Sequence, residues 1–164
     1  MFCIGDKIVY PMHGAGIIED LQEKDIDGQT RLYYVLNIPV ASLTITIPQL
    51  KAEDLGVREV YTKEEVLRVL EESHDDPNSP PENWNERYKY NYEKLKTGNL
   101  KEALIVYKSL YFREREKGLS GMEKKLLSTA KQIILSELAV SQNIDKNSAE
   151  DMLGDVVSKY AAAV

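Results

Sequence analysis

The amino-acid sequence predicts an α+β protein of two domains, a small twisted β-barrel of SH3 or Tudor type followed by an all-α helical bundle. Short β-branched runs separated by turn residues fill residues 1–60, and the spacing of apolar residues becomes helical from residue 62. At 164 residues, of which 43 % are hydrophobic, the chain has room for one or two domains. We place the β domain at residues 1–60, a linker helix and a Pro-rich joint at 61–79, and the helical domain at 80–164.

The strands of the first domain are marked by β-branched residues and by tight turns. Residues 7–11 form a short run that ends at a proline. Asp27-Gly28 is typical of a hairpin, because a type I′ turn needs positive φ at both central residues. The longest strand is expected over residues 32–38. Residues 43–48 alternate strictly, with Leu43, Ile45 and Ile47 on one face and two threonines on the other. About four or five short strands with such turns favour a small barrel.

The helices of the second part are marked by their ends. Thr62 and Glu65 have the spacing of a capping box, and so do Ser120 and Glu123. Residues 79–82 suggest another helix start, with proline at the first helical position. Gly98 and Gly118 are typical of helix ends, and a last helix is expected over residues 147–160. The pattern predicts a linker helix followed by a compact bundle of about four helices.

The sequence argues against several classes of protein. No stretch reaches the ~18 apolar residues of a membrane span, and the first residues lack a secretion-signal pattern, so we expect a cytoplasmic protein without a membrane partner. Cys3 is the only cysteine, which rules out an intrachain disulfide and a thiolate metal cage. His13 and His74 stand in different contexts and predict no zinc site. Because no common catalytic motif is present, we expect no enzyme activity, no metal and no cofactor.

The net charge of −6 is unevenly distributed along the chain. Residues 1–74 contain 7 Lys and Arg against 13 Asp and Glu, whereas residues 75–164 contain 14 of each kind. Residues 80–132 contain 12 basic and 7 acidic residues. This basic block of the helical domain could face phosphates, although only weakly without help from a partner.

Trp84 is the only tryptophan, and it follows the Pro-rich joint at the head of a basic and aromatic helix. A flat apolar ring flanked by Arg87 and Lys89 suits a wedge against nucleic acid. It equally suits the sealing of two domains. Trp84, Tyr88, Tyr92 and Leu95 recur on one helical stripe, which favours a tryptophan that is at least partly buried in the bundle. The residues themselves leave both interpretations open.

The N-terminal run Gly5-Asp6-Lys7-Ile8-Val9-Tyr10-Pro11-Met12-His13-Gly14-Ala15-Gly16 resembles the opening of the CarD/CdnL family of bacterial transcription regulators. The front domain of this family is shared with the polymerase-interacting domain of the transcription-repair coupling factor. The resemblance covers nearly the whole chain in order. Beyond the first run it rests on Tyr34-Val35-Leu36, on residues 43–48, on Gly56-Val57-Arg58, and on residues 83–89, 118–127 and 130–138.

The resemblance implies a specific mechanism. The Tudor-like front domain would bind the β subunit of RNA polymerase by extending one of its sheets edge to edge, a mode that relies on main-chain hydrogen bonds. The helical domain would then reach promoter DNA at the upstream edge of the transcription bubble, where its tryptophan enters the minor groove and slows bubble collapse. The contacts would not read sequence. We expect a monomer until polymerase binds, associated with the nucleoid through polymerase.

The resemblance also assigns roles to single residues. Trp84 would be the wedge, Arg87 and Lys89 would contact the DNA backbone, and Lys124 and Lys125 would contact phosphates at the head of a later helix. The residues assigned to the polymerase interface are Lys24, Thr44, Thr46 and Ile47. Some relatives carry arginines at the positions of Lys24 and Thr46, so Thr46 removes a charge from this surface.

A second function stays open at this point. The protein could be a polymerase-binding adaptor that never contacts DNA, in which Trp84 packs the two domains together. The two functions differ in the environment that they require for Trp84: exposed for a wedge, and buried between domains for an adaptor.

Overall fold

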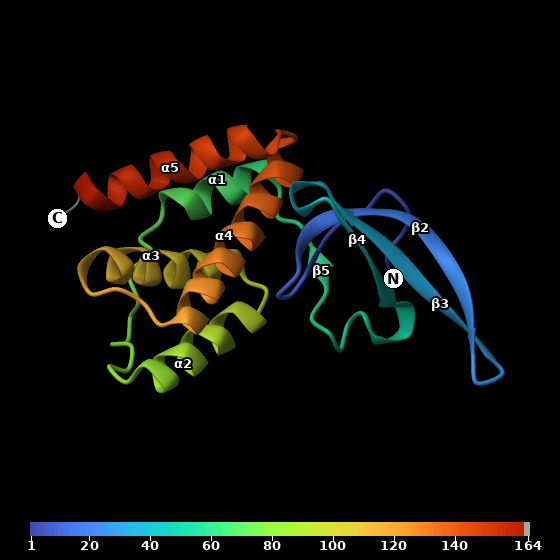
Figure 1. Ribbon diagram of the computed structural model, residues 1–164. Coiled ribbons are helices and arrows are strands. Elements are labelled where there is room, and N and C mark those ends of the chain that lie inside the picture. Colours follow the sequence, from blue (N-terminus) through green and yellow to red (C-terminus); the bar gives the residue numbers. More distant parts are fainter. Residues whose placement is uncertain (163–164) are drawn as a thin grey trace.

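The computed structural model describes residues 1–162. Within them, a five-stranded antiparallel sheet precedes five α-helices, and the sheet and the helices stand side by side as two domains (Figure 1). The two-domain α+β class predicted from the sequence is confirmed.

The strands lie in the order β4-β3-β2-β1-β5. Their bounds are β1 (Lys7–Tyr10), β2 (Gly14–Ile26), β3 (Gln29–Ile38), β4 (Leu43–Pro48) and β5 (Arg58–Glu59). The turn between β2 and β3 has φ of 52° at Asp27 and 77° at Gly28, as the predicted hairpin requires. Beyond a register shift between Ile18 and Asp20, the two strands continue as a long exposed ribbon (Figure 1).

The sheet of the front domain is open, so the small twisted barrel predicted from the sequence does not close. β5 has only two residues and pairs with β1 alone, whereas β4 at the other edge pairs with β3 alone. β5 and β4 do not pair with each other, so the sheet keeps two edges. The sheet still buries one apolar face, as its alternating strands predict. Ala52 and Val57, from the segment between β4 and β5, complete the core under that face, whose buried strand residues are Ile8, Ile18, Tyr34, Leu36, Ile38 and Ile47.

The helices are α1 (Lys63–Glu71), α2 (Trp84–Lys96), α3 (Leu100–Glu116), α4 (Gly121–Gln142) and α5 (Lys146–Ala162). Both predicted capping boxes are present, at the starts of α1 and α4. The start of α2 lies later than predicted: the side chain of Asn83 accepts hydrogen bonds from the backbone N–H of Asn85 and Glu86, so the prolines precede the helix. None of the helices in residues 1–162 is long and apolar enough to cross a membrane.

The helix predicted as a linker packs into the helical domain. Val66 and Leu70 of α1 are buried in the same apolar core as α3, α4 and α5. Each such buried aliphatic side chain contributes about 1.5–3 kcal/mol. Within the predicted linker, the segment that follows α1 and contains the Pro-rich joint has no helix or strand.

The two domains touch at the corner between β1 and β2 and at Val40, which follows β3 and is buried in the helical core. Val9 and Ala15 form a small apolar cluster with Val140 of α4, and the backbone N–H of Ala15 donates to Ser136 Oγ at 2.8 Å. Gly14 is needed here because its φ is 119° and a Cβ would lie 2.7 Å from Ser136 Oγ. The front domain is therefore seated directly on α4.

Candidate nucleic-acid and polymerase interfaces

Trp84 is the first residue of α2, and this helix begins at the end of the helical domain that lies away from the sheet (Figure 1). Asn83 caps the helix directly before it, and 41 % of the tryptophan remains exposed. Tyr88, Tyr92 and Leu95 pack against the helical core, so the predicted stripe holds for its later members, whereas Trp84 belongs to none of the buried apolar clusters. A half-exposed ring at a helix start suits contact with a partner better than it suits domain packing.

Arg87 and Glu123 form a buried ion pair between the start of α2 and the start of α4. Arg87 Nε donates to Glu123 Oε2 at 2.7 Å, and Nη2 donates to Oε1 at 2.8 Å. The remaining nitrogen Nη1 donates to the Glu82 carbonyl at 2.6 Å. Burial acts to raise the pKa of the Glu123 carboxyl, but hydrogen bonds from Arg87 and Ser120 hold it below its usual value. The Glu123 carboxylate is therefore charged at neutral pH, and both of its oxygens accept hydrogen bonds from Arg87.

This geometry contradicts the assignment of Arg87 as a contact to the DNA backbone. Arg87 is only 4 % exposed, and all three of its guanidinium nitrogens donate within the protein. The ion pair of Arg87 with Glu123 instead joins the first turns of α2 and α4. Trp84 and the first turn of α4 therefore lie at the same end of the domain. The capping-box spacing revealed Glu123 as a helix-start residue, but it carried no signal of the partner on α2.

Three lysines at this end of the domain have free charges. Lys89, Lys124 and Lys125 are exposed, and within residues 1–162 none of them has a carboxylate within ion-pair distance. Four other lysines of the basic block are paired: Lys94 with Asp76 and Glu102, Lys96 with Glu93, Lys101 with Glu72, and Lys108 with Asp75. The unpaired Lys89, Lys124 and Lys125 thus lie on the helices that begin beside Trp84. The free N–H groups at the head of α4 add partial positive charge there.

The residues assigned to polymerase fall into two places. Thr44 and Thr46 are exposed on β4, which is an edge strand and pairs only with β3. Ile47 is 0 % exposed and belongs to the sheet core, so its side chain cannot reach a partner and only its backbone remains for such a contact. The outer edge of β4 can accept another strand through its unpaired N–H and C=O groups.

Lys24 lies apart from β4, on the exposed β2–β3 ribbon. It pairs with Arg31 of β3, whereas β4 already ends at Pro48 opposite Tyr33. Its Nζ lies 4.9 Å from the centre of the Tyr33 ring, within range of a cation–π contact. A partner would need to extend past the end of β4 to meet Lys24.

Comparison with known proteins agrees with this division of the chain. A family model described as "CarD-like/TRCF RID domain" matches residues 2–61, and one described as "CarD, C-terminal domain" matches residues 65–154. The Bacillus subtilis (strain 168) protein named "Putative transcription factor YdeB" is 37 % identical over 147 residues, which cover 88 % of this chain and 94 % of that protein.

A solved structure also matches the front of the chain. It is the solution NMR structure of the 72-residue N-terminal domain of Myxococcus xanthus CarD, with 24 % identity and a TM-score of 0.32 over 36 % of this chain and 79 % of that one. The family assignment itself rests on the two family models and the B. subtilis relative. The chain belongs to the CarD family, with a CarD-like/TRCF RID domain at its front and a CarD C-terminal domain behind it.

Proposed function

We propose that this protein binds the β subunit of RNA polymerase through the β4 edge of its front domain and stabilises the promoter open complex by wedging Trp84 at the upstream edge of the bubble. Membership of the CarD family supports the general part of this function, a transcription regulator that interacts with RNA polymerase. The placement of Trp84 supports the finer part.

The main support for the wedge proposal is that Trp84 is exposed and lies near unpaired cations. The ring is 41 % exposed at the start of α2, and the buried Arg87–Glu123 pair holds the first turn of α4 beside it. Lys124 and Lys125 on that turn, and Lys89 on α2, can contact phosphates on either side of an inserted ring. Inserting an apolar ring between base pairs costs a few kcal/mol in intact duplex, and less where the strands have already separated.

Binding to polymerase would compensate for the weak affinity that the protein has for DNA on its own. Because phosphate contacts provide most of non-specific DNA affinity, a chain of net charge −6 binds DNA weakly by itself. Pairing of β4 with a strand of polymerase would hold Trp84 near the DNA at a high effective concentration. Three phosphate contacts and one wedge are then sufficient.

The test is the lifetime of a promoter open complex, formed by a cognate bacterial polymerase alone, with the protein, and with its Trp84→Ala variant. We expect the protein to lengthen the lifetime, and Trp84→Ala to remove most of this effect, a loss of roughly tenfold for one stacked ring. Leu67→Ala is a matched control, because Leu67 is a large apolar residue that is 40 % exposed on α1. It should leave the lifetime unchanged.

A polymerase-binding adaptor without DNA contact is the second candidate. It is favoured by the balanced charge of residues 75–164, which contain 14 basic and 14 acidic residues. In that case the wild type and Trp84→Ala would bind polymerase equally well, and neither would change the open-complex lifetime.

A further inference from the structure

The polymerase edge and the DNA-facing end lie on different domains. β4 belongs to the sheet, whereas α2, which starts with Trp84, and α4 both begin at the far end of the helical domain (Figure 1). A protein that is anchored at one end and acts at the other depends on a fixed angle between its domains. Apolar contacts join the domains at two places, Val9 and Ala15 with Val140, and Val40 and Met12 with the helical core, but apolar contacts carry no direction. The hydrogen bond from the Ala15 N–H to Ser136 Oγ is directional but fixes one point only, so a contact with several bonds is needed to set that angle.

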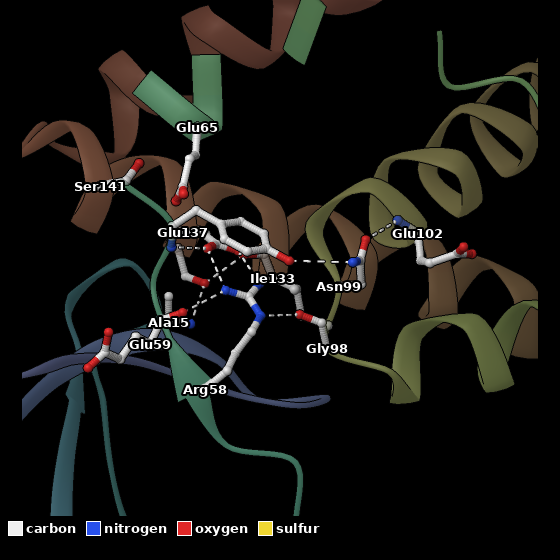
Figure 2. A network of polar contacts seen from close by, with 12 residues as sticks. Ala15, Arg58, Glu59, Glu65, Gly98, Asn99, Glu102, Ile133, Glu137 and Ser141 are labelled. Carbon is white, nitrogen blue, oxygen red and sulfur yellow. Dashed lines mark hydrogen bonds and ion pairs between the residues drawn. The ribbon is translucent and has the colours of Figure 1, made fainter. Parts of the chain in front are cut away.

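Arg58 and Glu137 supply such a contact across the domain boundary (Figure 2). Arg58 lies on β5, and its Nη1 and Nη2 donate to the two carboxylate oxygens of Glu137 on α4 at 2.9 and 2.7 Å. Glu137 is buried, with 2 % of its side chain exposed, against 22 % for Arg58. The backbone N–H of Tyr61 donates to the same carboxylate at 3.2 Å. The guanidinium also lies 4.1 Å from the centre of the Tyr61 ring.

The third nitrogen of Arg58 extends the contact to the helix that carries Trp84. Arg58 Nε donates to the carbonyl of Gly98 at 2.9 Å, and Gly98 follows the end of α2 with φ of 71° (Figure 2). A single guanidinium therefore joins β5 to α4 and to the segment that ends α2. At their other ends, these same two helices are joined by Arg87 and Glu123.

The chemistry of the contact gives it directional strength. A guanidinium is a planar group whose N–H donors have fixed directions, so two parallel bonds to a carboxylate define an orientation as well as a distance. A third bond from the same plane, to Gly98, removes the rotation that two bonds would leave. Lysine at this position would keep the charge but present one ammonium group with no fixed plane.

We propose that Arg58 and Glu137 are positioning residues that fix the angle between the polymerase-binding domain and the helices that present Trp84 to DNA. This inference rests on the proposed function. The contact of Arg58 with Glu137 would couple polymerase binding to the DNA contact of Trp84, although it lies far from both partners. If the contact is lost, each domain keeps its own core, and the tryptophan is no longer held at the position where the bubble edge lies.

The experiment compares Arg58→Lys and Glu137→Gln with the wild-type chain. Three quantities are measured: affinity for the polymerase β subunit, the relative orientation of the two domains from residual dipolar couplings, and the open-complex lifetime. We expect affinity for the β subunit to stay within about twofold, while the couplings show a changed or averaged domain orientation. The lifetime effect should fall on the order of tenfold, because the effective concentration of the wedge drops. Arg58→Lys keeps the attraction to Glu137 and is the variant that tests the proposal if Glu137→Gln fails to fold.

Glu59→Gln is the matched control. It removes a carboxylate from the neighbouring residue of β5, whose side chain is exposed and makes no hydrogen bond or ion pair within residues 1–162. It should change none of the three quantities. A folded Arg58→Lys variant that keeps the wild-type domain orientation, or that loses it and still gives the full lifetime, would overturn the proposal. A wild-type protein that fails to bind the β subunit or to lengthen the lifetime would instead overturn the proposed function.

Discussion

Arg87 is the residue whose contribution to stability is most open to measurement. Removing one partner of a buried ion pair leaves the other charged and unpaired, which costs about 3–5 kcal/mol. We therefore expect Arg87→Met to lower the free energy of unfolding by roughly that amount in urea titrations at pH 7. The double variant Arg87→Met with Glu123→Leu, which leaves no buried charge, should recover most of the loss. An equal loss in the single and the double variant would contradict this account.

The same pair predicts an acid dependence of stability. The pKa of Glu123 is lowered in the folded protein from its ordinary value of 4.5. The unfolded chain therefore binds a proton first as the pH falls, and the contribution of the pair is complete above that value and is lost below it. The wild type should lose more stability than the double variant between neutral pH and the acid range, as followed by urea unfolding at a series of pH values.

At the scale of elements, features encoded within a few residues could be predicted from the sequence. The capping boxes of α1 and α4 depend on residues three positions apart, and the Asp27-Gly28 turn on two neighbours. Pairings between distant residues could not be predicted, because they depend on how the helices pack. Arg87 and Glu123 are 36 residues apart, and Arg58 and Glu137 are 79 apart. The open sheet belongs to the same class, because closure depends on β5 and β4, which do not meet.

The element that the proposal places against polymerase is β4, and its outer edge gives a prediction for hydrogen exchange. Every second backbone N–H of an edge strand points away from the sheet. We expect these N–H groups of residues 43–48 to exchange fast in the free protein and to become protected when a fragment of the polymerase β subunit binds. The control lies in the same sheet: β5, the opposite edge, is occupied by β1 and the helical domain, so its exchange should not change. Protection at β5 instead of β4 would mean that polymerase binds elsewhere.

At the scale of the whole molecule, the acidic front of the chain and the unpaired lysines near Trp84 lie on different domains, and this division predicts how salt affects function. The front of the chain is acidic, and the unpaired lysines Lys89, Lys124 and Lys125 lie on the helices that begin beside Trp84. Each phosphate contact adds about −0.9 to the slope of the logarithm of affinity against the logarithm of salt concentration. We expect the protein to steepen the salt dependence of open-complex lifetime by roughly three times that value. Polymerase alone gives the reference slope.

Removal of two of these charges should then remove a matching part of the added slope. Lys124→Gln with Lys125→Gln should reduce it by about 1.8, since two contacts of −0.9 are lost. Lys101→Gln is the control, because Lys101 lies on α3 and is paired with Glu72 at 3.0 Å, so its charge is already matched within the protein. If the double variant keeps the full added slope while Trp84→Ala still shortens the lifetime, the wedge acts without these lysines. The phosphate contacts would then have to come from other cations at the same end, since a ring inserted at the bubble edge still needs the flanking backbone held in place.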